Sequence, residues 1–403
     1  MKKYYLCGPT VYNTPHIGNL RPILTFDLMI RALRYLKEDV YFLHNITDID
    51  DKIINKAIEE HKTEEEIAKK YEKYYLEQLN NFNIEKPTKI VRVTEHLQDL
   101  YNYIQKIIDK KHAYKINGNV YFDIMSLKDE YGKISHQKLD NLIYDELEDN
   151  SSLKKHPADF ALWKETKIGV KYDSPFGLGR PGWHTECSCF IDKYFNGETL
   201  DAHGGGIDLI FPHHENENIQ HFAIHNKEIA KQWLHFGTLN YKNQKMSKSI
   251  GNIIYPHDYL AKYSADSYRL LLFSSNYAKP INATDEIFNA NETLINKFIG
   301  IWNKSQLENE HLEINYNKVN EIAVYTSKLD FAKAFKEFIV LSKDKNQKGT
   351  FFETLRMLGF AFINKKITTD NKKLYQQWKE KVNEKNYEEA DKLRTKLIER
   401  KLI

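Results

Sequence analysis

The chain contains little cysteine and no long apolar run, and both absences limit what it can be. Its 403 residues include only three cysteines: Cys7, Cys187 and Cys189. Three scattered thiols cannot form the disulfide framework of a small secreted domain, so we expect reduced core residues or metal ligands. No stretch approaches the roughly 18 to 20 apolar residues that span a bilayer, and the N-terminus lacks the apolar region of a signal peptide. We therefore expect a cytoplasmic protein with no membrane partner.

A large net charge is also absent from the chain as a whole. Its 59 basic and 56 acidic residues leave a formal charge of +3. The excess lies at the end: residues 371–403 carry ten Lys or Arg and six Asp or Glu, whereas the preceding 370 residues carry 49 and 50. This balance is compatible with phosphate contacts near the C-terminus, and equally with a solvated helix face.

The N-terminal pattern predicts an α/β fold. Hydrophobic residues make up 41% of the chain, which is ordinary for a globular protein, and the length favours two or three domains. An apolar strand at residues 4–7 is followed by a break at Gly8, a helical pattern at about 22–36 and an apolar strand at 40–43. This order predicts a parallel, Rossmann-like sheet with a ligand at the loop after the first strand.

The rest of the chain divides into an irregular part and a helical part. Helices are expected near residues 63–81 and 94–111. Residues from about 114 to 182 carry strand-like pieces and turn signals, which predicts an insertion in the α/β domain. From residue 287 the pattern is helical to the end. We therefore predict a Rossmann-like catalytic domain at 1–286, with the insertion at 114–182, and an all-helical domain at 287–403.

A short motif, His16-Ile17-Gly18-Asn19, lies between the first strand and the first helix. The glycine lets the backbone approach a flat base closely, and the N-terminus of the following helix favours phosphate. A histidine held there can donate a hydrogen bond to phosphoryl oxygens as charge develops. On its own, such a motif is more often only a turn.

A second motif, Lys245-Met246-Ser247-Lys248-Ser249, is rich in lysine and small hydroxyl residues. Two lysines in a flexible loop can fold over a triphosphate and neutralise the leaving pyrophosphate. Taken alone, the segment is also compatible with an exposed basic turn. The two motifs in this order resemble the signatures of class I aminoacyl-tRNA synthetases.

Candidate metal ligands are spread over three segments. Cys7 ends the first strand, and His213 and Glu217 lie four residues apart in a helix expected to begin at the preceding proline. An i, i+4 pair presents both side chains on one helix face. Thiolate, imidazole and carboxylate are all zinc ligands. Cys187 and Cys189 are separated by one residue and would point oppositely on an extended segment, so at most one of them is needed.

Longer runs make the chain similar to cysteinyl-tRNA synthetases over nearly its full length. The resemblance implies an ATP-dependent ligase of protein biosynthesis, which activates L-cysteine to cysteinyl-adenylate and transfers it to tRNA(Cys). Its partners would be L-cysteine, ATP and tRNA(Cys), and we expect a monomer. The matching runs are residues 5–12, 45–53, 179–187, 203–209 and 211–217.

The same resemblance assigns a metal site and an amino-acid site. A zinc-bound thiolate would distinguish cysteine from serine by one bond, which lessens the need for editing. Around the bound amino acid the resemblance places Thr47, Trp183 and His203, each of which is equally compatible with a packing role. The four implied ligands of one Zn²⁺ are Cys7, Cys187, His213 and Glu217.

The ATP-binding positions also follow from the resemblance. Asn19 stands where the family's first motif usually has a second histidine; an amide can still donate a hydrogen bond, so we expect retained activity with altered ATP contacts. Related enzymes typically continue past Ile403 with a tail that helps read the anticodon, and residues 387–394 resemble the family's C-terminal helix. The implied ATP-binding residues, with Mg²⁺ accompanying the nucleotide, are His16, Gly18, Asn19, Lys245 and Lys248.

Two alternatives remain open at this point. The ligase that joins cysteine to an amino sugar in mycothiol synthesis resembles the synthetases in the same zinc site and ATP loops, but its acceptor is a small amine. The helical region and basic end beyond residue 287 favour tRNA. A non-catalytic relative that binds tRNA or holds zinc structurally would be indicated by loss of an ATP motif, yet both motifs are present apart from Asn19.

Overall fold

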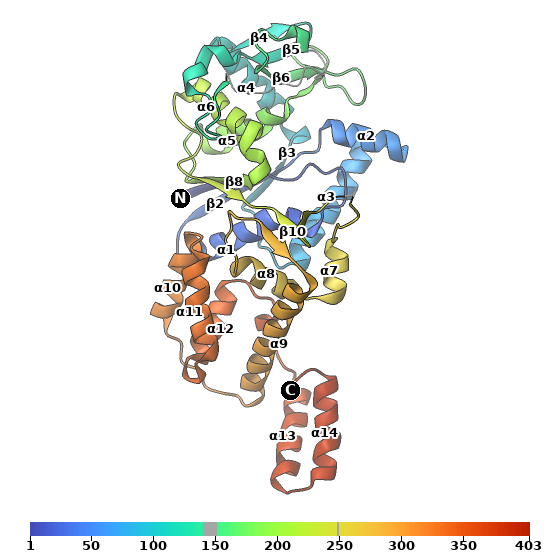
Figure 1. Ribbon diagram of the computed structural model, residues 1–403, viewed down its shortest axis with the longest axis vertical. Helices are drawn as coiled ribbons and strands as arrows, with labels where there is room; N and C mark the ends of the chain where they lie inside the picture. The colour runs from blue at the N-terminus through green and yellow to red at the C-terminus, as the bar shows by residue number, and fades with distance from the viewer. Residues whose placement is uncertain (140–150, 248–249) are drawn as a thin grey trace.

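A five-stranded parallel sheet forms the centre of the computed structural model, which describes residues 1–139, 151–247 and 250–403 (Figure 1). The strand order is β3-β2-β1-β8-β9, and every neighbouring pair is parallel. This is the order of a doubly wound sheet, in which ligands bind beyond the carboxyl ends of the strands where the connections diverge. The strands are β1 (Lys2–Leu6), β2 (Val40–Ile46), β3 (Lys89–Arg92), β8 (Ala202–Gly206) and β9 (Trp233–Phe236).

Helices cover both faces of the sheet, as the near-continuous apolar strands require. Side chains alternate along β1, so that Tyr4 and Leu6 pack in one hydrophobic cluster and Tyr5 packs in another. The first cluster includes α1 and α3, and the second includes α4, α5 and α6. These helices and the short α2 are α1 (Arg21–Tyr35), α2 (Asp51–Glu60), α3 (Glu64–Asn81), α4 (Leu97–Asp109), α5 (Trp183–Phe195) and α6 (Glu215–His225).

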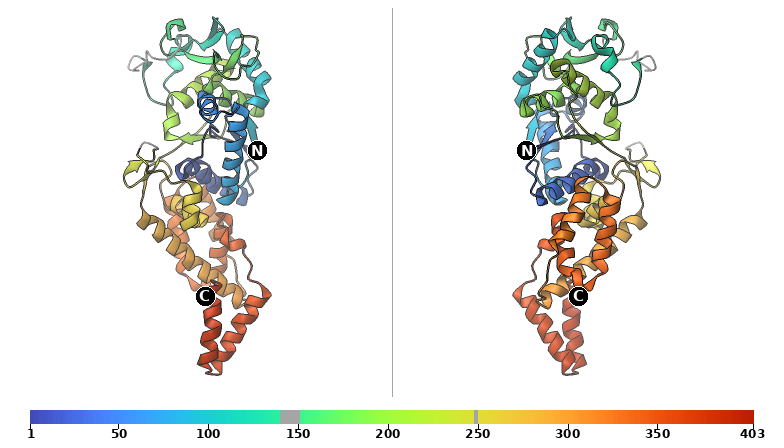
Figure 2. Two further views of the ribbon diagram at one scale, coloured as in Figure 1. Left: turned by 90° about the vertical axis from the view of Figure 1, so that its right-hand side faces the viewer. Right: turned by 90° about the vertical axis from the view of Figure 1, so that its left-hand side faces the viewer.

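A four-stranded antiparallel sheet lies where the sequence predicts an insertion, at the end of the molecule opposite the C-terminal helices (Figures 1 and 2). Its last strand leads directly into α5, so the sheet is attached next to the carboxyl edge of the central sheet. Gly182 joins the two elements, and a Cβ there would lie 1.9 Å from the Ala161 carbonyl oxygen, so only glycine fits. The strands are β4 (Ala113–Ile116), β5 (Asn119–Phe122), β6 (Phe160–Glu165) and β7 (Gly179–Pro181).

A small third sheet carries the second sequence motif. In it β10 (Leu239–Tyr241) pairs with β11 (Gln244–Lys245) and with β12 (Ile281–Ala283). The turn between β10 and β11 places Lys242 and Asn243 at positive φ. Lys245 therefore projects from a hairpin edge beside the central sheet.

The remainder of the described chain is helical, as predicted from residue 287 onward (Figure 1). The observed run starts slightly earlier, because Thr284 caps α9 by accepting a hydrogen bond from the backbone N–H of Ile287. The helices are α7 (Pro256–Lys262), α8 (Ala265–Phe273), α9 (Asp285–Leu307), α10 (Tyr316–Ser327), α11 (Phe331–Lys343), α12 (Lys348–Met357), α13 (Thr369–Asn383) and α14 (Tyr387–Glu399).

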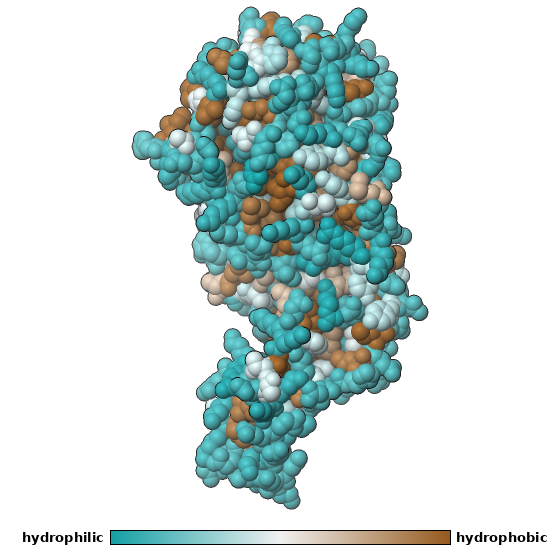
Figure 3. Space-filling model, turned by 180° about the vertical axis from the view of Figure 1, so that it is seen from behind, coloured by the Kyte–Doolittle hydropathy of each residue, from teal (hydrophilic) through white to brown (hydrophobic). Residues whose placement is uncertain are grey.

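The last two helices form a hairpin that extends away from the body (Figures 1 and 2). A small apolar cluster of Leu307, Tyr375, Leu397 and Leu402 attaches it to α9. Its surface is mostly hydrophilic on the face seen in Figure 3, which agrees with the excess of Lys and Arg in the sequence. Residues 384–386 form the turn between its two helices.

A buried ion pair joins the α/β and helical parts. Arg269 on α8 lies 2.6 Å from Asp27 on α1, and neither side chain is more than 1% exposed. Arg269 also donates hydrogen bonds to the carbonyl oxygens of Phe82 and Leu358. Removing two charges from water costs free energy, and the ion pair together with these hydrogen bonds offsets that cost.

Most expected helices are confirmed, with shifts at their ends. The pattern at residues 94–111 comprises a 3-10 turn, Thr94–His96, followed by α4. The helix expected from Pro212 is α6 from Glu215, and directly before it lies a π-helical turn, Ile210–His214, in which Phe211 has extended backbone angles. No helix of the described residues has the length and apolar character needed to cross a bilayer.

Candidate active site

Four potential metal ligands meet at the carboxyl edge of the central sheet. Cys7 follows β1, Cys187 lies in the second turn of α5, and His213 and Glu217 flank the start of α6. Their ligand atoms lie within 4.8 Å of one another, although the residues come from three distant parts of the sequence. The sequence-predicted ligand set is therefore brought together.

The distances in this group are those expected around one ion. The sulfur atoms of Cys7 and Cys187 are 3.9 Å apart, and the sulfur of Cys187 is 3.7 Å from Nε2 of His213. Zinc–ligand bonds of about 2.0–2.3 Å in a tetrahedron give ligand separations of roughly 3.3–3.8 Å. Oε1 of Glu217 lies 3.5 Å from the Cys7 sulfur but only 2.6 Å from His213 Nε2, so that last pair would separate slightly around an ion.

The electrostatics of the four residues favour a cation between them. Burial acts to raise the pKa of the Glu217 carboxyl, but His203 and His213 hold it well below its usual range. Burial likewise opposes ionisation of Cys187, and hydrogen bonds from Cys7 and His213 nevertheless lower its pKa to about 7. Burial acts to lower the pKa of His213, but Glu217 and Cys187 raise it to about 10, so positive charge is favoured beside these two groups, and a divalent ion fits this donor set.

Cys189 is not part of the group. Both cysteines lie in the helix α5 and not in an extended strand. Residues two apart on a helix lie on different faces, so Cys187 and Cys189 point in different directions. Cys189 is 1% exposed in the hydrophobic cluster of α4, α5 and α6, and burial raises its pKa well above the ordinary value.

A second potential ligand group shares two members with the first. It consists of Cys7, His203, His214 and Glu217. His203 Nε2 lies 2.5 Å from Oε2 of Glu217, and His214 Nε2 lies 3.6 Å from the Cys7 sulfur. His214 Nδ1 is in turn 2.9 Å from His235 Nε2, and the pKa of His214 lies well below its ordinary value because of burial and His203. The second group therefore shares Cys7 and Glu217 with the first and adds two buried imidazoles.

The three residues expected around the amino acid lie next to the ligand group. Thr47 follows β2 and donates a hydrogen bond to Oε2 of Glu186 at 2.9 Å. Trp183, 37% exposed, stacks on His213 with ring centroids 4.3 Å apart. His203 is fully buried against Glu217. Thr47 and Trp183 flank the ligand group, whereas His203 supports one of its members.

A pocket of about 230 Å³ contains the residues predicted to bind ATP. It lies beyond β1 and is lined by Cys7, His16, Gly18, Asn19 and Lys245. A Cβ on Gly18 would lie 2.9 Å from both the His16 ring and the Met246 side chain, so glycine keeps this wall thin. Burial, together with Lys245, lowers the pKa of His16. Lys248 lies outside the described residues.

Asn19 has a local structural role in this pocket. Its Oδ1 accepts a hydrogen bond from the backbone N–H of His16 at 2.9 Å, which closes the short 3-10 turn Ile17–Leu20. The amide is exposed at the pocket wall. Asn19 therefore fixes the backbone that presents His16.

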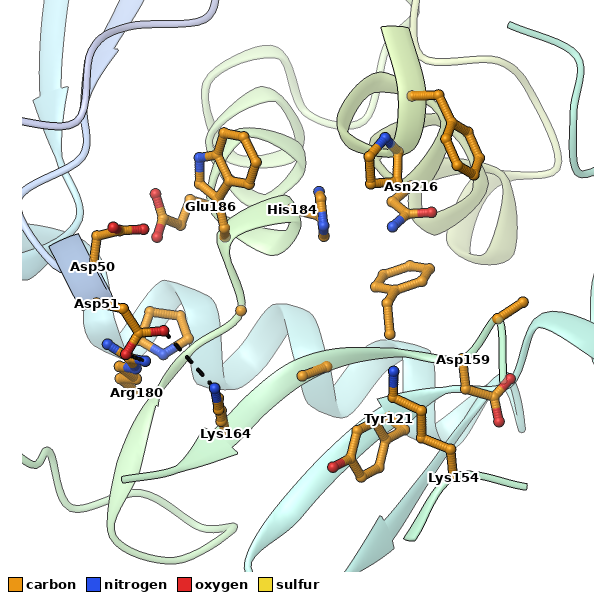
Figure 4. A pocket seen from close by; sticks show the side chains of 18 of the residues that line it. Asp50, Asp51, Tyr121, Lys154, Asp159, Lys164, Arg180, His184, Glu186 and Asn216 are labelled. Atoms are coloured by element: carbon orange, nitrogen blue, oxygen red, sulfur yellow. Dashed lines mark hydrogen bonds and ion pairs between the residues drawn. The ribbon is translucent and has the colours of Figure 1, made fainter. Parts of the chain in front are cut away.

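A second cavity of about 410 Å³ lies between α5 and the insertion sheet, and Trp183 is one of the residues that line it (Figure 4). We call it the insertion cavity. Asp50 and Asp51 line it from the start of α2, and the first turn of α5 lines it from the side of the ligand group. Its other chief lining residues are Tyr121, Phe160, Lys164, Arg180, Trp183, Glu186 and Phe211.

Sequence reasoning missed several residues that hold the site. Asn45 accepts hydrogen bonds at Oδ1 from Tyr5 Oη at 2.9 Å and from the backbone N–H of Gly8 at 2.8 Å. It thus fixes the backbone directly after Cys7. Glu186 and His214 directly adjoin the candidate ligands Cys187 and His213, and the sequence carries no separate signal for either. A buried polar residue at the end of a strand was the available signal for Asn45.

Comparisons with known proteins agree with this architecture. The family model described as tRNA synthetases class I (C) catalytic domain matches residues 1–293. Solved structures share the fold at low identity: methionyl-tRNA synthetase of Mycobacterium tuberculosis bound by methionyl-adenylate has a TM-score of 0.63 at 14% identity, covering 93% of this chain and 94% of that one. The Agrobacterium radiobacter LeuRS in complex with tRNA and LeuAMS has a TM-score of 0.67 at 10% identity, covering 91% and 86%. The family model, which matches well over half of the chain, shows that the chain is a class I tRNA synthetase, and the shared fold agrees with this.

Curated relatives narrow the class. A cysteine–tRNA ligase of Malacoplasma penetrans is 42% identical over 100% of this chain and 95% of its own length. Another of Mycoplasma mycoides subsp. mycoides is 41% identical over 99% and 95%. The chain therefore belongs to the cysteine–tRNA ligase family.

Proposed function

We propose that this protein activates L-cysteine with ATP to form cysteinyl-adenylate and then transfers the cysteinyl group to tRNA(Cys). Family membership supports the reaction class. One structural observation supports this assignment most strongly. Four potential metal ligands lie together directly beside the ATP pocket: Cys7, Cys187, His213 and Glu217. Amino acid and nucleotide would thus lie on the two sides of the loop that follows β1.

The four residues would hold one Zn²⁺. The ion, when bound, supplies a soft Lewis acid that prefers the substrate thiolate to a serine hydroxyl. The chain's own residues set the geometry: Glu217 is held from both sides by His203 and His213, and Cys187 is held on α5. Such support fixes ligand orientation.

Residues next to the ligand group would position the rest of the amino acid. Thr47 directs its hydroxyl hydrogen to Glu186, so a lone pair of its oxygen remains available to accept a hydrogen bond from a substrate ammonium group. Trp183 packs over His213 and shields that side of the site from water. Binding of the amino acid between these side chains would bring its carboxylate toward the ATP pocket.

ATP, with Mg²⁺, would occupy the pocket lined by His16, Gly18, Asn19 and Lys245, with Lys248 contributing from the same loop. Lys245 brings positive charge close to His16, and burial keeps that imidazole neutral and able to donate one hydrogen bond. Positioning and charge neutralisation of the pyrophosphate would supply most of the rate, since no protein nucleophile is required.

The helical part from residue 287 would bind tRNA as a domain separate from the catalytic domain at 1–286. The α13–α14 hairpin projects from the body and carries the excess of basic residues, which suits phosphate contacts. We further propose that the protein acts as a monomer in the cytoplasm.

The proposal is tested by offering labelled cysteine and ATP to the purified protein with tRNA(Cys) or, in parallel, with the amino-sugar acceptor of mycothiol synthesis. We expect label to become attached to tRNA alone. Attachment to the sugar alone would contradict the proposed acceptor. The relatives described above favour tRNA, because they match this chain along its whole length, including the helical end.

A further inference from the structure

We infer that Arg21 and Tyr268 hold together the two motifs proposed to bind ATP, and that the charge of Arg21 favours the triphosphate. Both are positioning residues, because neither lines the ATP pocket itself. The inference rests on the proposed function, which places ATP between the first motif, residues 16–19, and the hairpin that carries Lys245.

Arg21 gathers the backbone behind one wall of the ATP pocket. It is the first residue of α1 and directly follows the short turn that contains the first motif. Its Nη1 donates a hydrogen bond to the carbonyl oxygen of Thr238 at 2.6 Å. Its Nη2 lies 2.7–3.0 Å from the carbonyl oxygens of Asn276, Tyr277 and Lys279. One buried side chain thus joins the start of α1 to two distant segments of the chain.

The segments that this guanidinium joins lead into the second motif. Thr238 lines the ATP pocket and directly precedes β10, the strand that pairs with the end of the hairpin at Lys245. The adjoining Gly237 packs so closely on the other segment that a Cβ there would lie 2.4 Å from the carbonyl oxygen of Lys279. The position of Lys245 relative to the first motif therefore depends on a close backbone contact that the guanidinium holds together.

Tyr268 connects the motifs in a second way. This residue of α8 is fully buried, and its Oη donates a hydrogen bond to the carbonyl oxygen of Ile17 at 2.7 Å. The backbone N–H of Ile17 in turn donates to the carbonyl oxygen of Ile254 at 3.0 Å, shortly after the second motif. The backbone of the first motif is therefore held both from α8 and from the segment that follows the second motif.

The charge of Arg21 lacks a counter-ion. The side chain is 1% exposed, its acceptors are neutral carbonyl groups, and it pairs with no carboxylate among residues 1–139, 151–247 and 250–403. Burial lowers its pKa to about 10, so the guanidinium stays protonated at neutral pH. The helix dipole also disfavours a cation at the N-terminus of α1. A triphosphate in the adjacent pocket would supply the missing negative charge.

Two substitutions at Arg21 separate its charge from its hydrogen bonds. Arg21→Lys keeps the charge and loses the forked hydrogen bonds, whereas Arg21→Gln removes the charge as well. Arg269→Lys is the matched control, because Arg269 is another fully buried arginine that donates to backbone carbonyl groups, and it lies outside the ATP pocket.

Tyr268→Phe removes a single hydroxyl and is nearly isosteric, so it tests the inference even if an Arg21 variant does not fold. Tyr259→Phe is its control. Tyr259 is an equally buried tyrosine in contact with Tyr268, but its hydroxyl forms a hydrogen bond with Ser267 and not with either motif.

The experiment measures ATP binding to the full-length protein by calorimetry without cysteine or tRNA, and then cysteine-dependent pyrophosphate exchange. We expect ATP affinity to fall about threefold in Tyr268→Phe and Arg21→Lys, the effect of weakened hydrogen bonding, and about tenfold in Arg21→Gln. The KM for cysteine and the zinc content should stay within about twofold of the parent, because the metal-ligand group is not displaced. Both controls should lose stability in urea and keep their ATP affinity.

Unchanged ATP affinity in Tyr268→Phe and in the folded Arg21 variants would overturn the inference, as would an equal loss in the two controls. Equal losses in Arg21→Lys and Arg21→Gln would contradict the role of the charge. A parent protein that binds ATP but shows no cysteine-dependent exchange would instead refute the proposed function, since the binding assay requires neither cysteine nor tRNA.

Discussion

Replacing one buried thiol by a hydroxyl separates metal binding from packing in this protein. Cys187→Ser changes the sulfur that lies 3.9 Å from the Cys7 sulfur and 3.7 Å from Nε2 of His213. Serine is nearly isosteric, but its hydroxyl does not ionise near neutral pH and is a poor ligand for a soft ion. The expected effect is loss of zinc affinity with the fold retained.

The magnitude follows from sharing the binding free energy among the ligands. Sites with four protein ligands bind zinc with about 10–16 kcal/mol, which is about 2.5–4 kcal/mol per ligand. At 1.4 kcal/mol for each factor of ten, Cys187→Ser should weaken zinc binding about 10²- to 10³-fold. Competition with a chromophoric chelator measures this change directly.

Cys189→Ser is the matched control, because Cys189 is an equally buried thiol two residues away on the same helix. A hydroxyl in its apolar surroundings should cost about 1–3 kcal/mol of stability, with zinc affinity unchanged. Full zinc affinity in Cys187→Ser, or equal loss in both variants, would refute the assignment of Cys187 as a ligand.

Four further predictions address the nucleotide site and the stability of the fold. Lys245→Ala should raise the KM for ATP roughly tenfold in pyrophosphate exchange and leave zinc content unchanged, because Lys245 lines the ATP pocket only. An unchanged KM would contradict its role. Lys248→Ala should abolish adenylate formation in the same assay. Asp27→Asn should cost about 3–5 kcal/mol in urea unfolding, since it leaves the buried guanidinium of Arg269 unpaired; a loss below about 1 kcal/mol would refute this. Burial lowers the pKa of His44 from 6.5 to about 4, so the unfolded chain binds a proton that the folded chain does not. Stability should therefore fall, by up to about 3 kcal/mol from this group, as pH drops from about 6.5 to 4, and His44→Gln should reduce that slope.

The sequence predicts the central fold well because its signals are local. The apolar strands at the start, the helix after the first motif and the helical end all depend on periodicity within one segment, and each is present. The start of α6 lies three residues later than predicted because residues 212–214 belong to a π-helical turn, Ile210–His214, which local periodicity does not reveal. His213 and Glu217 nevertheless lie close together, as their spacing of four residues predicts.

The sequence predicts which residues form the candidate site, but it does not predict the hydrogen bonds and contacts that connect them. Resemblance named Cys7 and Cys187, but only the fold places them at the edge of one sheet, 180 positions apart in the chain. The supporting contacts of Asn45 and Glu186 depend on tertiary packing. The insertion cavity does not follow from the sequence, because it is formed between α5 and the insertion sheet, whose relative placement the sequence pattern does not specify.

Selection of cysteine through a metal-bound thiol is tested most directly by pyrophosphate exchange with cysteine and with serine, before zinc removal, after removal by a chelator, and after zinc is restored. We expect strong preference for cysteine in the zinc-loaded protein, loss of cysteine-dependent exchange on removal, and recovery with zinc. Exchange that continues with unchanged preference for cysteine in fully zinc-free protein would contradict this mechanism of selection.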